Sequence, residues 1–186
     1  MNIISRIFRS FSPNRKVRII LAGHSASGKD FFKNYLVSKG FRASTSHTTR
    51  PRREGEQDGK EYYFIPTFEF NRMISSNEFF EHKSFNGWKY GVSKKEAKNS
   101  QVLIQTPSGI HSLPLGFLSR SIVIYFDIPT NVRKQRMQER GTPISEIDRR
   151  ITADYLDFDD FAHYDIRIRD PYYNPDELLK TIKAMM

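Results

Sequence analysis

A group of eight residues near the amino end has the types and spacing of a loop that binds phosphate: Gly23, His24, Ser25, Ala26, Ser27, Gly28, Lys29 and Asp30. Its two glycines let backbone N–H groups turn inward without a Cβ in the way. The ammonium group of Lys29 has the reach to meet the outer phosphates of a nucleoside triphosphate. This G-x4-G-K pattern predicts a phosphate-binding loop, or P-loop; the alternative is an ordinary tight turn.

Asp30 stands where a P-loop usually carries Ser or Thr, whose hydroxyl group binds Mg²⁺. A carboxylate oxygen is also a hard ligand that suits Mg²⁺, although it brings negative charge close to the phosphates. Asp30 is therefore the candidate metal ligand, and Mg²⁺ is the expected cofactor.

The segments on either side of the loop favour the P-loop over the tight turn. The apolar run 17–22 predicts a buried strand before the loop. After the loop, apolar residues recur at helical spacing from Phe31, and Lys39 and Gly40 end the helix. A strand, a glycine loop and a helix in that order direct the positive end of the helix dipole at a phosphate.

The rest of the chain alternates strand-like and helix-like segments, which is typical of an α/β fold with a parallel sheet covered on both faces. Thr67 is a candidate cap for a helix reaching Asn77, with Phe70, Met73 and Ile74 as its buried residues. Strands are predicted at 62–65, 102–104, 122–126 and 166–168, and further helices at 130–140, 145–156 and 176–186.

Composition limits the classes of protein to consider. The 186 residues suffice for one α/β domain, and a net charge of +9 favours anionic partners without choosing among nucleotides, nucleic acid and membrane surfaces. The absence of cysteine excludes a disulfide framework and suits a reducing cytoplasm. No apolar run approaches the ~20 residues that span a bilayer, so no transmembrane segment is expected.

Residues 1–16 mix apolar and basic side chains and form a basic N-terminal tail. Two interpretations stay open for it. The tail could fold as a short amphipathic helix with an anchoring or targeting role, or it could be a frayed end before the first strand, which we favour.

The polar, arginine-rich block 44–64, STSHTTRPRREGEQDGKEYYF, resembles the monophosphate-binding segment of guanylate kinases, a family of P-loop nucleoside monophosphate kinases. The likeness continues through NEFFE at 77–81, GWKYG at 87–91 and the arginines from Arg136 to Arg140-Gly141. It covers nearly everything from Val17 to the carboxyl end.

The resemblance implies a three-layer, parallel-sheet P-loop kinase core with an inserted subdomain that binds the nucleoside monophosphate (NMP) and with a helical lid. The implied guanylate kinase-like domain spans 17–186. Its core comprises 17–43, 93–133 and 157–186, its NMP-binding insert 44–92 and its lid 134–156.

Four residues match the family positions that hold the phosphate of GMP: Arg50, Arg53, Tyr62 and Tyr90. Arginine forks grip phosphate oxygens in two places, and tyrosine hydroxyls add neutral hydrogen bonds. A solvated basic loop is the alternative, and it would not account for the neighbouring aromatic residues.

Ser46 and Glu81 match the positions that recognise guanine. A carboxylate accepts hydrogen bonds from N1 and N2 of guanine, and adenine offers no such pair of donors. Seen without its motif, Glu81 would be an ordinary surface charge.

Three arginines resemble the lid residues that close on the phosphates of ATP: Arg136, Arg140 and Arg150. With Lys29 they are the candidate catalytic residues, because their charges would offset the charge on the transferred group. Taken alone, Arg136 and Arg140 would be a basic helix face. The segment 141–145 lacks helical periodicity and is the candidate lid tip.

The chain departs from the family pattern at several positions. Val92 replaces a usual hydroxyl residue, positions 104 and 106 lack the usual aspartates, and Arg169 replaces a usual asparagine. With Asp30 in the P-loop, these departures suggest that the metal-binding carboxylate has moved from a sheet strand to the loop.

The resemblance implies transfer of the γ-phosphoryl group of ATP to GMP or dGMP in the cytoplasm, by a monomer or homodimer without a nucleic acid partner. The alternatives are a broader deoxynucleoside-monophosphate kinase, a ribose-bisphosphate kinase and a non-catalytic module that binds a phosphorylated protein. Binding of RNA or DNA is suggested only by the net charge.

Overall fold

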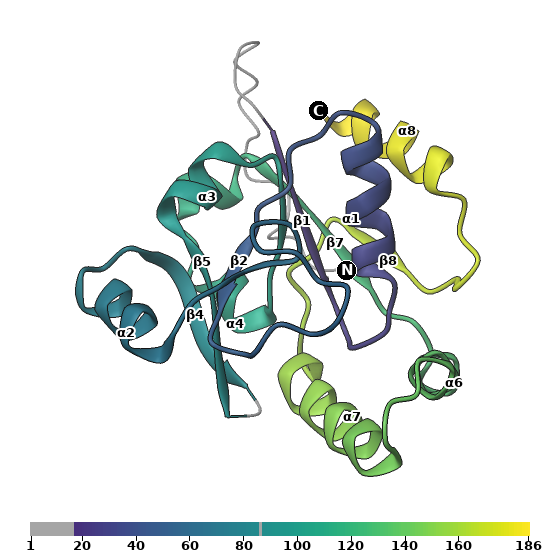
Figure 1. Cartoon of the computed structure of the whole chain (residues 1–186). Coiled ribbons are helices and arrows are strands. Elements are labelled where there is room, and N and C mark those ends of the chain that lie inside the picture. Colours follow the sequence, from purple (N-terminus) through teal and green to yellow (C-terminus); the bar gives the residue numbers. More distant parts are fainter. Residues whose placement is uncertain (1–16, 86) are drawn as a thin grey trace. The chain divides into compact units, whose positions relative to one another are not determined.

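The computed structural model of the chain describes residues 17–85 and 87–186 (Figure 1). The predicted basic tail, residues 1–16, lies outside the described residues. The chain divides into two compact units, one made of the residues up to Tyr35 together with Ile104–Met186, the other of Leu36–Leu103. Each unit is described by itself below.

Three strands of a four-stranded sheet with the order β6-β1-β7-β8 lie in the first unit, and β6 crosses the boundary between the units at Ile104. Its strands are β1 (Arg18–Gly23), β6 (Val102–Ile104), β7 (Ser121–Phe126) and β8 (Ile166–Ile168). The β1–β7 and β7–β8 pairs are parallel. Since β1 and β7 are apolar and buried along nearly their whole length, they have the pattern expected of central strands covered on both faces.

The helices associated with this sheet are α1 (Lys29–Ser38), α4 (Pro107–His111), α5 (Leu115–Leu118), α6 (Thr130–Glu139), α7 (Ile144–Phe158) and α8 (Pro175–Met185). Of these, α1, α6, α7 and α8 begin and end near the predicted positions, whereas the short helices α4 and α5 were not predicted. Gly40, with φ +88°, follows the end of α1 as the predicted stop. Asn174 caps α8 by accepting hydrogen bonds from the N–H groups of Asp176 and Glu177. The predicted α/β class with a parallel sheet is confirmed.

The second unit contains a mixed sheet with the order β3-β2-β5-β4. Its strands are β2 (Ser46–Thr48), β3 (Tyr62–Phe64), β4 (Phe79–Phe85) and β5 (Trp88–Ser93), and its complete helices are α2 (Thr67–Ser75) and α3 (Lys94–Asn99). Strand β2 pairs parallel with β3 and antiparallel with β5, which in turn pairs antiparallel with β4.

Phe70, Met73 and Phe79 form the buried cluster beneath α2, with Ile65 and Ile74 packed against it. The rings of Phe70 and Phe79 are stacked with centroids 4.3 Å apart. The sequence predicted Phe70, Met73 and Ile74 as buried; Phe70 and Met73 are buried, and Ile74 is half-buried.

The predicted cap of α2 is wrong. Thr67 is the first residue of the helix, and Pro66 occupies the cap position without a side-chain hydrogen bond. Pro66 adopts the extended conformation with φ −67° and ψ 156°, so the chain is still outside the helix at that residue.

Among the described residues, none of the helices has the length and apolar character needed to cross a membrane.

Gly23 is the residue at which β1 turns into the P-loop, and its φ of +150° is one that other residues rarely adopt. A Cβ placed on Gly23 would lie 2.6 Å from the carbonyl oxygen of Phe126. A backbone atom of a buried strand cannot move aside easily. The first glycine of the loop is therefore required by the packing of β1 against β7.

We predict that Gly23→Ala lowers the free energy of unfolding by about 1–3 kcal/mol, measured by urea denaturation. The matched control is Gly116→Ala in α5, where the nearest atom to the new Cβ is the tip of the flexible Arg120 side chain at 3.7 Å. The control should change stability by less than about 0.5 kcal/mol. Equal losses in the two variants would contradict this account of Gly23.

Candidate active site

The P-loop lies between the end of β1 and the start of α1, as predicted. Gly28 and Ala26 have φ values of +96° and +58°, so two residues of the loop have the positive φ that side chains with a Cβ rarely adopt. The ammonium group of Lys29 donates hydrogen bonds to the carbonyl oxygens of Gly23, at 2.6 Å, and His24, at 2.7 Å. The lysine charge is thereby held against its own loop.

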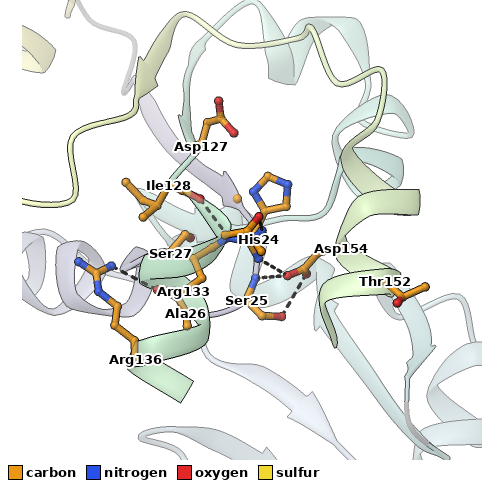
Figure 2. A network of polar contacts seen from close by, with 12 residues as sticks. His24, Ser25, Ala26, Ser27, Asp127, Ile128, Arg133, Arg136, Thr152 and Asp154 are labelled. Atoms are coloured by element: carbon orange, nitrogen blue, oxygen red, sulfur yellow. Dashed lines mark hydrogen bonds and ion pairs between the residues drawn. The ribbon is translucent and has the colours of Figure 1, made fainter. Parts of the chain in front are cut away.

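Arg136 of α6 is the lid arginine that contacts the P-loop (Figure 2). Its guanidinium group donates to the carbonyl oxygen of Ala26 at 3.2 Å and to that of Pro171 at 3.0 Å. A Cβ on Gly28 would lie 3.7 Å from Nη1 of Arg136. The first unit thus brings together two of the predicted catalytic cations, Lys29 and Arg136.

The other two predicted lid arginines make no hydrogen bond to the P-loop within residues 17–85 and 87–186. Arg140 lies exposed at the carboxyl end of α6. In α7, Arg150 donates from Nε to Glu146 at 2.8 Å, and Arg149 binds the same carboxylate. A role for Arg140 and Arg150 on the donor phosphates stays a prediction.

An ion pair that the sequence analysis missed lies against the P-loop (Figure 2). Asp154 of α7 accepts hydrogen bonds from the backbone N–H of Ser25, at 2.8 Å, and from its hydroxyl group, at 3.1 Å. The same carboxylate binds Nη1 of Arg133 at 2.9 Å. Because 21 residues separate Arg133 from Asp154 and 129 separate Asp154 from Ser25, no local spacing could have revealed this network.

The side chain of His24, a P-loop residue, packs against aromatic rings of the first unit. Its ring lies 4.6 Å from that of Phe158 and 5.8 Å from that of Tyr125, and its Nδ1 atom is buried without a hydrogen-bond partner in the described part of the chain. Burial, with a further contribution from the nearby Arg133 charge, lowers the pKa of His24 to about 4. The imidazole is therefore neutral at neutral pH.

Asp30 lies in the first turn of α1, next to Lys29. Its side chain is 78% exposed and forms an ion pair with Lys33 at 3.7 Å. No group of three or more His, Asp or Glu residues that could hold a metal occurs among the residues that the structure describes. One accessible carboxylate is nevertheless compatible with Mg²⁺, which commonly binds through one or two carboxylates together with substrate phosphates and water.

The predicted acceptor residues lie in the second unit, and its sheet brings several of them to one face. Partners across a ladder point to the same face, as do alternate residues along a strand. Ser46 pairs with Tyr62, and Thr48 pairs with Tyr90. Because Ser46 and Thr48 alternate along β2, Ser46, Tyr62 and Tyr90 share a face. The rings of Tyr62 and Tyr90 are 5.9 Å apart.

Glu81 of β4 belongs to the same face. Lys83 pairs with Tyr90, and Glu81 lies two residues before Lys83 on the strand. Burial raises the pKa of Glu81, partly opposed by the charge of Lys83. Within residues 17–85 and 87–186 the Glu81 carboxyl group has no hydrogen bond or ion pair, so both of its oxygens are available to a ligand.

Arg50 is buried beside this face and is held by a partner that the sequence analysis missed. It donates to Glu56 and to the carbonyl oxygen of Pro51, each at 2.7 Å. Its guanidinium group lies over the rings of Tyr62 and Phe64, 5.6 and 5.5 Å from their centroids. The hydrogen bond from Arg50 lowers the pKa of Glu56 despite the partial burial of that carboxyl group.

The backbone of Arg53 binds the same carboxylate, that of Glu56. The N–H of Arg53 donates to Glu56 at 2.7 Å, and its side chain is exposed without a hydrogen bond among the described residues. Of the predicted phosphate-binding arginines, Arg50 is therefore fixed in place and Arg53 extends into solvent. Glu56 is one of four acidic residues between Arg53 and β3, so the sequence did not single it out.

The neutral state of His24 predicts a pH dependence of stability. The unfolded chain takes up a proton below the ordinary value of 6.5, but the folded chain resists it down to about pH 4. Stability contributed by His24 is present above pH 6.5 and is lost as the pH falls toward 4. We predict that His24→Phe removes roughly one proton from the pH dependence of unfolding in this window.

Urea denaturation at several pH values between 4 and 7 measures this slope. His82→Phe, which alters a histidine in the second unit, is the control and should keep the wild-type slope. An unchanged slope in His24→Phe would show that the ring is protonated as readily in the folded protein as in the unfolded chain.

The chain is similar in sequence to known proteins of one family. The guanylate kinase family model matches residues 15–171. Guanylate kinases of Sus scrofa and Homo sapiens are each 34% identical over 138 residues, which cover 69% of this chain and 69% and 70% of those proteins. Guanylate kinase of Koribacter versatilis (strain Ellin345) is 30% identical over 178 residues, covering 88% of this chain and 76% of that protein.

A solved structure shares the fold. The crystal structure of guanylate kinase from Anaplasma phagocytophilum aligns with a TM-score of 0.67 at 24% identity, covering 92% of this chain and 87% of that one. The family match extends over most of the chain and includes both the P-loop and the sheet that carries Glu81. The chain therefore belongs to the guanylate kinase family of nucleoside monophosphate kinases.

Proposed function

We propose that the protein transfers the γ-phosphoryl group of ATP to GMP or dGMP, giving ADP and the corresponding diphosphate. The observation that carries the proposal is the gathering of Ser46, Tyr62, Glu81 and Tyr90 on one face of the second sheet. That set combines hydroxyl groups suited to a phosphate with one carboxyl group suited to guanine. No observation favours a ribose-bisphosphate kinase or a non-catalytic module.

The acceptor phosphate would bind to Arg50, Arg53, Tyr62 and Tyr90. Arg50 is the fixed member of this set, since Glu56 and Pro51 hold its guanidinium group in place. Preorganised cations of this kind lose little conformational entropy on binding and orient the acceptor oxygen for attack. Glu81 and Ser46 would then read the base, because guanine donates from N1 and N2 toward an acceptor.

The donor triphosphate would bind along the P-loop, with Lys29 and Arg136 offsetting its charge. Because the transition state spreads negative charge over the transferred group, cations fixed near that group accelerate transfer. Arg140 and Arg150 would join them when the lid, residues 134–156, closes and excludes water. Mg²⁺ bound at Asp30 would neutralise charge on the phosphates.

A reducing cytoplasm suits a chain without cysteine, and we include that compartment in the proposal. The reaction is tested by coupled ADP release with the ribo- and deoxyribonucleoside monophosphates of all bases. We expect GMP and dGMP to stand apart from the rest. Equal rates with every monophosphate, or no ADP release with any, would contradict the proposal.

Glu81 gives the proposal a pH signature. Burial raises its pKa above the ordinary value of 4.5, and a protonated carboxyl group cannot accept from both N1 and N2 of guanine. We predict that kcat/KM for GMP falls as the pH is lowered below neutrality. Glu81→Gln should lower kcat/KM for GMP by roughly 10- to 100-fold at neutral pH and remove the part of this dependence that comes from the carboxyl group.

The matched control for Glu81 is Glu78→Gln. Glu78 precedes the same strand, and its carboxylate pairs with Arg72 of α2. The control should keep both the activity and the pH profile of the wild type. Loss of GMP activity to the same extent in the two variants would mean that the effect is structural and that Glu81 does not read the base.

Asp30 is the proposed metal ligand, and substituting it shows whether Mg²⁺-dependent turnover needs an oxygen ligand at this position. We predict that Asp30→Ala abolishes Mg²⁺-dependent turnover, whereas Asp30→Ser, which supplies the usual hydroxyl ligand, retains it. A thermal-shift titration should show that Mg²⁺ increases the stabilisation by ATP in wild type and Asp30→Ser but not in Asp30→Ala. Wild-type turnover in Asp30→Ala would refute the metal-binding role.

A further inference from the structure

The carboxylate of Asp154 joins three segments of the first unit that are far apart in sequence. Both of its oxygens bind Ser25 in the P-loop, one through the backbone N–H and one through the hydroxyl group. One of these oxygens also binds Arg133 of α6. Asp154 itself belongs to α7, so a single side chain connects the P-loop to both α6 and α7 (Figure 2).

Arg133 is fixed independently of Asp154. It is only 4% exposed, and two further N–H groups donate to the carbonyl oxygen of Ile128 and the hydroxyl group of Thr130, both at 3.0 Å. Ile128 and Thr130 lie where β7 passes into α6. Arg133 therefore anchors Asp154 to the sheet and offsets its negative charge.

Ala26, which follows Ser25 in the P-loop, has a backbone conformation that needs support from its surroundings. Ala26 has φ +58°, the left-handed conformation, which costs a residue with a Cβ about 1–2 kcal/mol. Such a conformation persists only where the surroundings enforce it. Asp154 holds the N–H of Ser25 on one side of Ala26, and Arg136 holds the carbonyl oxygen of Ala26 on the other.

We propose that Asp154, supported by Arg133, is a positioning residue that keeps the P-loop in the shape required by the donor triphosphate. The inference rests on the proposed function, because ATP is the ligand whose binding it would affect. Asp154 does not touch the substrate in this account. It acts through Ser25, and its loss should weaken donor binding without changing the acceptor site.

A competing interpretation gives the opposite result. If Asp154 instead occupied an N–H group that the donor phosphate needs, its negative charge would oppose ATP binding, and removing it would lower KM for ATP. The charge balance with Arg133 argues for positioning, because the pair carries no net charge. Kinetics with the two substrates decides between the interpretations.

The test compares Asp154→Asn with the wild type. The amide keeps the shape of the side chain but loses the negative charge that binds Arg133 and one of the two acceptor oxygens, so it cannot accept from both the N–H and the hydroxyl group of Ser25. We expect KM for ATP to rise by about 10-fold or more, the usual effect of losing hydrogen bonds to a charged group. KM for GMP should stay unchanged.

Asp148→Asn is the matched control, since Asp148 belongs to the same helix and its exposed carboxylate pairs with Lys134 at 3.5 Å. It should change neither KM value, because surface ion pairs contribute little. A lower KM for ATP in Asp154→Asn, an unchanged one, or an equal rise in both KM values would overturn the proposal.

A second variant guards against a loss of folding in Asp154→Asn, which leaves Arg133 buried without its ion-pair partner. Glycine adopts the left-handed conformation without strain. Ala26→Gly combined with Asp154→Asn should therefore recover much of the lost affinity for ATP, whereas a merely structural defect would persist. Absence of recovery would contradict the role assigned to Ala26.

Failure of the proposed function gives a different result. If the wild type released no ADP with any monophosphate, the kinase proposal would fail, and the positioning proposal would still be tested by direct titration with a fluorescent ATP analogue. An affinity for the analogue that is the same in wild type and Asp154→Asn would then overturn the positioning role alone.

Discussion

The parallel pairing of β1 with β7 is the constraint on which the donor half of the site depends. It places Gly23 opposite Phe126, and the apolar side chains of both strands are buried, so a shift in register would disrupt their packing. The P-loop therefore starts at a fixed point of the sheet. The residues that hold it from outside, Arg136 and Asp154, belong to helices that follow β7 in the chain.

Local pairing controls several of the cations that the proposed chemistry uses. Lys29 is held by carbonyl oxygens of its own loop, Arg136 by those of Ala26 and Pro171, and Arg50 by Glu56. These pairs fix the direction of charges that would otherwise be mobile, which is the property that electrostatic catalysis requires. The net charge of +9 alone contained no such information, since it suited nucleic acid and membranes equally well.

The donor half of the site could be predicted from the sequence better than the acceptor half. Strands β1 and β7 are continuous apolar runs, and a glycine loop that joins a buried strand to a helix is a specific signal for phosphate binding. Strands β4 (FFEHKSF) and β5 (WKYGVS) show no regular alternation of apolar and polar residues, and only their register shows that Glu81 and Tyr90 share a face. That side of the site was expected from the family resemblance and not from any local pattern.

Some contacts could not be predicted from the sequence at all. The Asp154–Arg133 pair, its bonds to Ser25 and the buried ring of His24 arise from the folded arrangement of β7, α6 and α7. Glu56 lies only six residues from Arg50, yet nothing in a run of charged residues says which pair will form. Thr67 shows a prediction that was made and was wrong. Threonine favours the cap position, but Thr67 lies inside the helix, which begins directly after Pro66.

The central proposal is that one chain binds a donor nucleotide at the P-loop of the first unit and an acceptor nucleotide on the sheet of the second unit. Calorimetric titration with adenosine and guanosine joined through five phosphates tests it most directly. The account predicts one molecule bound per chain, displaced by either ATP or GMP, with an affinity at least ~10-fold above that for ATP alone because the second contact is intramolecular. Binding no tighter than that of ATP, with no displacement by GMP, would contradict the account.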